Sequence, residues 1–324
     1  MILLLSTVVL SLVLCGLYLR LAQRWRILDR PNERSSHKRP TPHGGGVPLL
    51  LAFVASFLLS SPWSFEYNWL VAMTFALMLL GISDDLWDLS VVLRFAVYAM
   101  VSISSAVVLL QSVTPIASSL GLIPLFGLSF AILWALNLYN FMDGIDGLAA
   151  SQCVLACIGA AALAFSSPEG GDYTLFCLLF AAAQLGFLCW NWAPARLFMG
   201  DAGSIPTGFL LAALAGYGAV HGIVSFATWS ILLAVFITDA SYTLIWRMAT
   251  GQNISRPHRL HAYQRLSRHW NSHRAVVHLL LGLNILWLFP IAWAVQLWPE
   301  HTVYFVILAY FPLLIGMAKA GKLT

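Results

Sequence analysis

The sequence predicts an all-α integral membrane protein with many transmembrane helices. Hydrophobic residues make up 60% of the 324 residues, and charged residues make up only 9%. A bilayer core about 30 Å thick requires helical spans of roughly 17–25 apolar residues. About eleven segments that approach this length follow one another along the chain. Soluble globular proteins do not have this composition, so we expect a single membrane domain over residues 1–324.

The expected spans are separated by short polar or glycine-rich segments. They cover about residues 2–19, 47–62, 69–83, 91–110, 121–138, 148–166, 173–190, 204–220, 223–245, 275–296 and 302–318. The first span is interpreted as a retained helix and not as a signal peptide. Its apolar core is long, and no small-residue cleavage site precedes the basic residues that follow it.

The positive charges predict how these spans are oriented. If eleven crossings alternate sides, all 17 Lys and Arg residues fall on one face, which the positive-inside rule assigns to the cytoplasm. The cytoplasmic loops are then about 20–46, 84–90, 139–147, 191–203 and 246–274. The opposite loops are short, and all of their charged residues are acidic. The amino terminus is therefore predicted outside and the carboxyl terminus inside, with any chemistry on the cytoplasmic face.

Three acidic motifs lie between spans on this face, at 84–88 (DDLWD), 143–147 (DGIDG) and 199–203 (MGDAG). Carboxylates in so apolar a chain are more often functional than decorative. Asp84 and Asp85 are adjacent, so they repel each other unless a cation lies between them. Mg²⁺ prefers one or two carboxylates together with phosphate oxygens, which favours a site for Mg²⁺ and a diphosphate. A solvated loop cluster is the alternative.

The second and third motifs predict further ligands at the same face. Asp143 and Asp146 are three residues apart, so on a helical turn they would point the same way, although a helix cap by Asp143 is an alternative. Asp201 lies between two glycines just before an expected span. It could therefore form a metal or phosphate cradle at a helix amino terminus, or act as an ordinary cap.

A fourth polar segment, PHRLHAYQRL at 257–266, lies in the long basic loop. His258 and His261 are accompanied by Arg259 and other arginines, a set suited to an anionic ligand. Contact with anionic lipid headgroups is the alternative. Asp239, deep in the ninth span, is expected either to be a structural polar partner or to support the site.

Five segments occur in a fixed order along nearly the whole chain: SSHKRPTPHGGG at 35–46, DDLWDLS at 84–90, NLYNFMDGIDGLAA at 137–150, RLFMGDAGS at 196–204 and PHRLHAYQRL. In this order they resemble the motifs of the polyprenyl-phosphate N-acetylhexosamine-1-phosphate transferases, glycosyltransferase family 4. The resemblance implies transfer of a sugar-1-phosphate from a UDP-sugar to undecaprenyl phosphate with release of UMP. It implies a Mg²⁺-dependent phosphotransferase, with Mn²⁺ as the alternative ion, in the bacterial inner membrane.

The resemblance also implies roles for individual residues. It assigns activation of the lipid phosphate and metal contact to Asp84 and Asp85, a metal ligand to Asp201, and catalytic positions near the diphosphate to Asp143 and Asp146. Substrate binding is expected from Lys38, Asn137, Asn140, Phe198, His258, Arg259 and His261. Of these, Asn140 and Phe198 are expected at the nucleotide, with Phe198 as a stacking surface for uracil.

Departures from the family pattern indicate the branch. The branch that uses the muramoyl-pentapeptide nucleotide carries consecutive histidines in the last large loop, whereas this loop reads HRLH. A simple UDP-N-acetylhexosamine donor (GlcNAc, QuiNAc or FucNAc) is therefore expected for a surface glycan of the O-antigen, enterobacterial-common-antigen or teichoic acid type. Phospho-MurNAc-pentapeptide transfer is the alternative. The expected partners are both substrates and membrane lipids, with a homodimer as an option and no nucleic acid.

Two other classes of protein stay open. A membrane prenyltransferase also uses DDxxD, but it normally has a second Asp-rich motif that DGIDG and GDAGS do not imitate. A transporter would place its coupling carboxylates near the middle of the bilayer, where this sequence puts only Asp239.

Overall fold

The computed structural model describes residues 1–31, 39–60, 63–111, 119–165, 167–168, 170–253 and 258–323. These residues form helices almost throughout, so the prediction of an all-α, multi-pass membrane protein is confirmed. The helices are α1 (Ile2–Trp25), α2 (Gly46–Leu59), α3 (Phe65–Trp87), α4 (Val91–Leu110), α5 (Ser119–Met142), α6 (Leu148–Ala164), α7 (Gly170–Asn191), α8 (Asp201–Val220), α9 (Phe226–Leu232), α10 (Ala234–Ala249), α11 (Ala262–His269), α12 (His273–Leu283), α13 (Phe289–Leu297) and α14 (Thr302–Ala320). A π-helical segment, η1 (Asn284–Leu288), joins α12 to α13, and a short 3₁₀ turn, η2 (Pro299–His301), precedes α14. The strands β1 (Leu28–Asp29) and β2 (Thr41–Pro42) pair antiparallel.

Among the described residues, eight helical segments are long and apolar enough to cross a membrane, or nine if α9 and α10 form one span. Two of the other expected spans correspond to shorter apolar helices, α2 with 14 residues and α6 with 17. At about 1.5 Å per residue, α2 is only about 21 Å long. The count of eleven crossings, and the sides of the two termini, therefore stay predictions.

One expected span has a different shape in the structure. The segment 223–245 was expected to be one straight helix, but α9 and α10 meet at an angle of 80°. The break lies at Leu233, whose dihedral angles (φ −103°, ψ 8°) leave the helical region. Neither proline nor glycine marks this position, so one continuous apolar run gave no sign of the change in direction.

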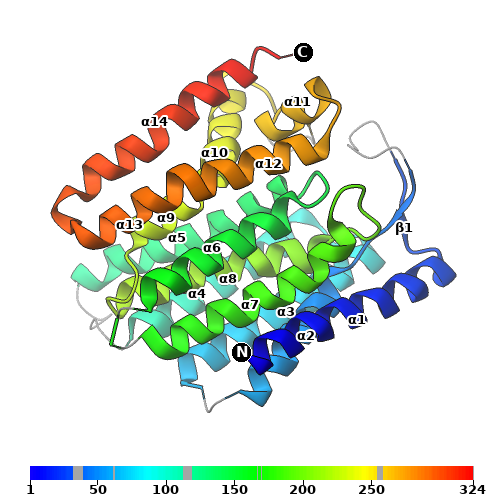
Figure 1. The fold of residues 1–324 in the computed structure, drawn as a ribbon, viewed down its shortest axis with the longest axis horizontal. Helices are drawn as coiled ribbons and strands as arrows, with labels where there is room; N and C mark the ends of the chain where they lie inside the picture. Colours follow the sequence, from blue (N-terminus) through cyan, green and yellow to red (C-terminus); the bar gives the residue numbers. More distant parts are fainter. Residues whose placement is uncertain are drawn as a thin grey trace.

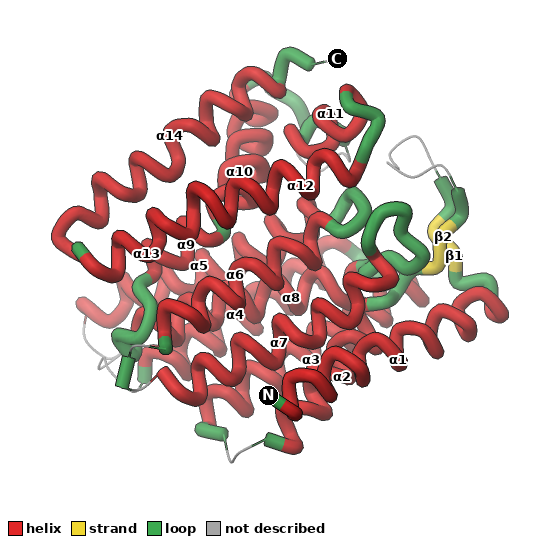
Figure 2. The backbone as a smooth tube through the Cα atoms, viewed as in Figure 1, coloured by secondary structure: helices red, strands yellow, loops and turns green. Residues whose placement is uncertain are grey.

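The helices lie side by side in a bundle with α8 near its centre (Figure 1). In the apolar stretch of α8, 83% is buried inside the protein, compared with 22% in the corresponding stretches of α1 and of the segment that contains α14. The amino terminus lies at one end of the bundle and the carboxyl terminus at the other. Figure 2 shows the strand pair and several long loops gathered at the end where the chain finishes. This end carries the acidic motifs.

Small residues bring α2, α3 and α8 together at this end. A Cβ atom on Gly46 would lie 2.1 Å from Cα of Gly203, and one on Gly81 would lie 2.5 Å from Cα of Ala202. The backbone N–H groups of Gly45 and Gly46 donate to the carbonyls of Phe198 (2.8 Å) and Met199 (2.9 Å). The glycine-rich segment therefore fixes the loop that leads into Asp201.

Candidate active site

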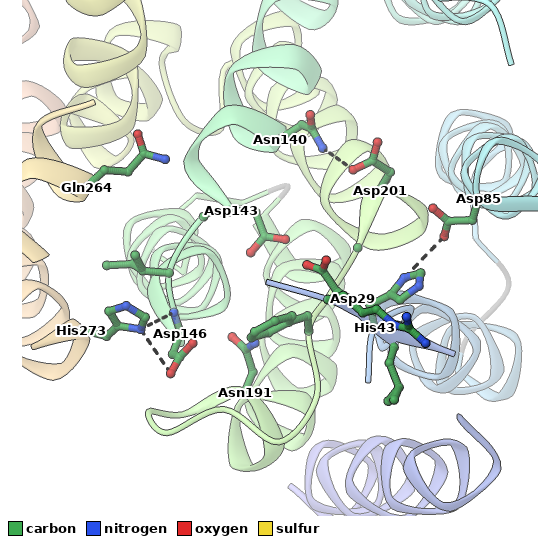
Figure 3. Close-up of a pocket in the computed structure, with 16 residues that line it drawn as sticks. Asp29, His43, Asp85, Asn140, Asp143, Asp146, Asn191, Asp201, Gln264 and His273 are labelled. Atoms are coloured by element: carbon green, nitrogen blue, oxygen red, sulfur yellow. Dashed lines mark hydrogen bonds and ion pairs between the residues drawn. The ribbon is translucent and has the colours of Figure 1, made fainter. Parts of the chain in front are cut away.

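A cavity of about 720 Å³ opens at this end of the bundle, and all three acidic motifs contribute to its lining. Asp85 comes from the last turn of α3, Asp143 and Asp146 from the loop between α5 and α6, and Asp201 is the first residue of α8. Figure 3 shows these side chains around one space, together with Asn140, Asn191 and His273. The fold thus places the four motif carboxylates around one cavity, together with Asp29 of β1, although they are as far apart as residues 29 and 201 in the sequence.

Asp201 is held in place from the end of α5. The Asn140 side-chain amide donates from Nδ2 to Asp201 Oδ1 at 2.8 Å and to Ser204 Oγ at 2.9 Å. Asp201 had been expected just before its helix, but α8 starts at Asp201 itself. Its carboxylate therefore lies at the positive amino-terminal end of that helix.

The paired residues of the first motif point in different directions. Asp85 lines the cavity, and its Oδ2 lies 3.9 Å from His43 Nδ1. Asp84 does not line it; its carboxylate pairs with Arg94 and accepts the backbone N–H of Leu89 at 2.9 Å. Successive residues of a helix point about 100° apart, and only one carboxylate of an adjacent pair can then face the cavity directly.

The second motif does not form the helical turn that we expected. α5 ends at Met142 and α6 begins at Leu148, so residues 143–147 form a loop. Asp146 Oδ2 accepts the backbone N–H of Ala195 at 3.0 Å and lies 3.2 Å from His273 Nδ1. Asp143 instead points toward the centre of the cavity (Figure 3). The two side chains therefore have different surroundings.

The surroundings of Asp143 disfavour the charged form of its carboxyl. Burial, with a further contribution from the Asp201 carboxylate, raises the pKa of Asp143 to about 7. Opposite charge nearby would lower it again. No group of three or more His, Cys, Asp or Glu side chains stands ready to hold a metal ion in the described part of the chain. Mg²⁺ needs only one or two carboxylates when phosphate oxygens complete its coordination, and the carboxylates of this cavity fit that requirement.

A second cavity of about 760 Å³ adjoins the first and shares Asp146, Phe198 and His273 with it. Its other charged lining residues are all basic: Arg39, Arg259, Arg268 and Arg274. These residues come close together. The pKa of Arg268 is lowered, mainly by burial and further by the positive charges of the nearby Arg259 and Arg265. So dense a positive charge beside the carboxylate cavity suits a ligand with several phosphate oxygens.

The remaining expected binding residues lie in different places. Asn137 is not among the lining residues of either cavity, and its Nδ2 donates to the carbonyl of Leu133 at 2.7 Å. Lys38 lies outside the described residues. Burial, followed by the neighbouring His261 and Arg247, lowers the pKa of His258 to about 4. His258 is therefore uncharged at neutral pH, unlike Arg259.

His261 does not face either cavity. It is only 5% exposed, and its Nδ1 lies 3.2 Å from Oδ1 of Asp239. Asp239 thus has a definite structural partner, which was one of the two roles expected for it.

Several polar lining residues were not singled out as site residues from the sequence, namely Asp29, Arg30, His43, Asn191, Gln264 and His273. Asn191 joins two motifs, because its Oδ1 accepts the N–H of Gly147 at 3.0 Å and its Nδ2 donates to the carbonyl of Leu197 at 3.0 Å. His43 and Asn191 stand inside or beside motif segments and could have been found there. His273 is 127 residues from its partner Asp146, so no local spacing pointed to it.

Comparison with known proteins shows which family this chain resembles. The family model for glycosyl transferase family 4 matches residues 67–219. The chain is 29% identical to the probable undecaprenyl-phosphate N-acetylglucosaminyl 1-phosphate transferase of Bacillus subtilis (strain 168), over 97% of this chain and 88% of that protein. It is 30% identical to the decaprenyl-phosphate N-acetylglucosaminephosphotransferase of Mycobacterium tuberculosis (strain ATCC 25618 / H37Rv), over 79% of this chain and 73% of that protein. The phospho-N-acetylmuramoyl-pentapeptide-transferase of Aquifex aeolicus (strain VF5) is 28% identical over 61% of this chain and 66% of its own length.

Proposed function

The chain belongs to glycosyl transferase family 4, and we propose that it transfers an N-acetylhexosamine-1-phosphate from a UDP-sugar to undecaprenyl phosphate. The observation that carries the proposal is the pair of adjoining cavities, one lined by carboxylates and the other by arginines, at one end of an apolar bundle. A water-soluble nucleotide and a lipid phosphate can meet only where such a bundle reaches the interface. Because the basic residues gather at this end, the proposal places it on the cytoplasmic side of the membrane.

The reaction exchanges one phosphate bond for another. A phosphate oxygen of the lipid attacks the phosphorus that bears the sugar, and the bond from this phosphorus to the bridging oxygen breaks. The products are UMP and a lipid diphosphate linked to the sugar. Both substrates are anions, so the site must compensate their mutual repulsion and the charge that shifts to the leaving group.

The residues of the two cavities divide this work. Asp85 and Asp201 would hold Mg²⁺, which supplies positive charge to the phosphate oxygens. Asn140 orients Asp201 through the 2.8 Å hydrogen bond. Arg259, Arg268 and Arg274 would bind the phosphates of the nucleotide, and Phe198, which lines both cavities, would stack on uracil. Asp84, held by Arg94, would position the last turn of α3, so that Asp85 faces the acceptor.

The donor is proposed to be a simple UDP-N-acetylhexosamine, with UDP-GlcNAc as the first to try. The Bacillus subtilis and Mycobacterium tuberculosis relatives are both named for N-acetylglucosamine phosphate transfer. The histidine run that accompanies the muramoyl-pentapeptide nucleotide is replaced here by HRLH.

The proposal is tested with purified enzyme, undecaprenyl phosphate, Mg²⁺ and a panel of UDP-sugars, with UMP as the product measured. We expect UMP release that needs the lipid, the metal and a UDP-N-acetylhexosamine together. Asp201→Asn keeps the size of the side chain but removes its charge, and it should lower turnover by about 10²–10³-fold. Asp172→Asn is the matched control, because Asp172 lies in the first turn of α7 at the far end of the bundle.

Two results would contradict the proposal. UMP release from every UDP-sugar without added lipid would indicate a hydrolase. Equal activities of Asp201→Asn and Asp172→Asn would show that the carboxylate cavity takes no part in the reaction.

A further inference from the structure

We propose that Asp239 and Tyr263 are positioning residues that hold the loop 143–147, and with it Asp143, in the carboxylate cavity. Neither residue lines that cavity. They act through α11, the short helix within the long basic loop. The inference rests on the proposed function for its kinetic test, but its structural part does not depend on the identity of the substrates.

The first step is the attachment of α11 to α10. Asp239 is 2% exposed, and its Oδ1 and Oδ2 accept the backbone N–H groups of Ala262 (2.9 Å) and Tyr263 (3.0 Å). The same carboxylate contacts His261 Nδ1 and Thr243 Oγ1, each at 3.2 Å. The first N–H groups of a helix have no partner within that helix. Asp239 therefore caps α11 from another helix, and its negative charge lies at the positive end of α11.

The second step is the contact of α11 with the acidic loop. The hydroxyl of Tyr263 donates to the carbonyl of Phe141 at 2.9 Å, two residues before Asp143. The same hydroxyl also lies against Gly144, where a Cβ atom would be only 2.1 Å from the oxygen. The ring of His261 stacks on that of Phe141 with centroids 6.4 Å apart. The residues on both sides of Asp143 are thus fixed by the start of α11.

The two steps form one chain of contacts from α10 to Asp143. α11 has only eight residues, and so short a helix is not stable by itself. Its position therefore depends on the cap from Asp239. Without that cap, Tyr263 would no longer be held at Phe141 and Gly144, and the loop would lose a support that the cavity itself does not provide. This explains why α10 keeps a buried carboxylate that does not line the carboxylate cavity.

The test compares two hydroxyl deletions of the same kind. Tyr263→Phe removes the hydroxyl that donates to the carbonyl of Phe141. Tyr310→Phe removes a similar, partly buried hydroxyl that donates to the carbonyl of Ser230, away from the cavity. Losing one such hydrogen bond corresponds to about 3- to 10-fold in rate if the effect is expressed in turnover. We expect that loss in kcat for Tyr263→Phe, with KM for the UDP-sugar little changed, and no loss for Tyr310→Phe. A raised KM with unchanged kcat for Tyr263→Phe would overturn the proposal.

Coupling between the two residues is a sharper measurement. Asp239→Asn should lower kcat by about 10-fold or more. One of the two carboxylate oxygens is replaced by an NH₂ group, which cannot accept a hydrogen bond from the backbone N–H of α11. If both residues act through α11, the double variant Asp239→Asn/Tyr263→Phe should be little worse than Asp239→Asn alone. Losses that multiply would show two independent roles and overturn the proposal.

Amide hydrogen exchange separates this inference from the proposed function. Exchange at residues 141–147 should accelerate in Tyr263→Phe and Asp239→Asn and stay at the wild-type rate in Tyr310→Phe. This comparison needs no substrate, so it decides the positioning role even if the wild-type enzyme releases no UMP. Unchanged exchange at 141–147 in Tyr263→Phe would overturn the inference.

Discussion

At the scale of single residues, Asp143 shows how a site can be built at the expense of stability. Its carboxyl is held at the centre of the cavity, and its pKa of about 7 lies well above the value of 3.8 expected without these surroundings. A carboxyl whose pKa rises on folding destabilises the folded state wherever the unfolded chain would already be ionised. The destabilisation therefore begins near pH 4 and is complete above pH 7.

The corresponding variant tests this sign directly. Asp143→Asn keeps the shape of the side chain without its charge, so it should raise the melting temperature of the metal-free enzyme by about 5 °C at pH 8. At pH 4 it should have much less effect, because the wild-type carboxyl is then protonated in the folded state and, with a pKa of 3.8, still partly protonated in the unfolded state. Saturating Mg²⁺ should reduce the gain at pH 8. The same gain at both pH values would mean that packing, and not charge, is responsible.

At the scale of helices, the site depends on how closely three of them approach one another. α2 and α8 meet at Gly46 and Gly203, where the atom nearest to an added Cβ is backbone and cannot rotate away. The glycine-rich segment and the GDAG motif are thus two sides of one contact. That contact sets the position of Asp201 relative to the glycine-rich segment, and the contact of Gly81 with Ala202 sets it relative to α3 and Asp85.

Gly46→Ala should therefore disturb both stability and activity. Relieving a 2.1 Å contact requires α2 and α8 to move apart, which for an overpacked core costs about 1–3 kcal/mol. We expect a lower melting temperature, measured in detergent, and a loss of UMP release. Gly316→Ala is the matched control in α14, since nothing lies within 4 Å of its added Cβ. It should be neutral or slightly stabilising, as alanine favours helices over glycine. Equal effects of the two changes would refute the close contact.

At the scale of the whole molecule, much of the arrangement could be predicted because the membrane restricts the choices. The apolar runs predicted the helices, and the positions of the acidic motifs between runs predicted that Asp85, Asp143 and Asp201 share one face. The bend at Leu233 could not be predicted, because it depends on packing and not on a helix-breaking residue. The contact of Asp146 with His273 was missed for a related reason. It joins a loop to the first residue of α12, and only the folded bundle brings the two together.

The orientation of the molecule in the membrane is the last prediction. Basic residues lie at the motif end of the bundle, so this end should face the cytoplasm and the opposite end the exterior. In a cysteine-free background, Glu66→Cys and Asp172→Cys should react with an impermeant thiol reagent added to intact cells. Arg39→Cys and Lys322→Cys should react only after the cells are opened.

The pair of Arg39 and Glu66 makes this experiment decisive for α2. Only α2 lies between these positions among the helices of the structure, and at 14 residues it is shorter than an ordinary span. Opposite accessibility would show that α2 crosses, by local thinning of the bilayer or by burial of its ends in protein. Labelling of both positions from outside would make α2 a re-entrant helix. The number of crossings would then be one fewer. The amino terminus and the basic residues between α1 and α2 would change sides, whereas α3 and the helices after it would keep the predicted orientation.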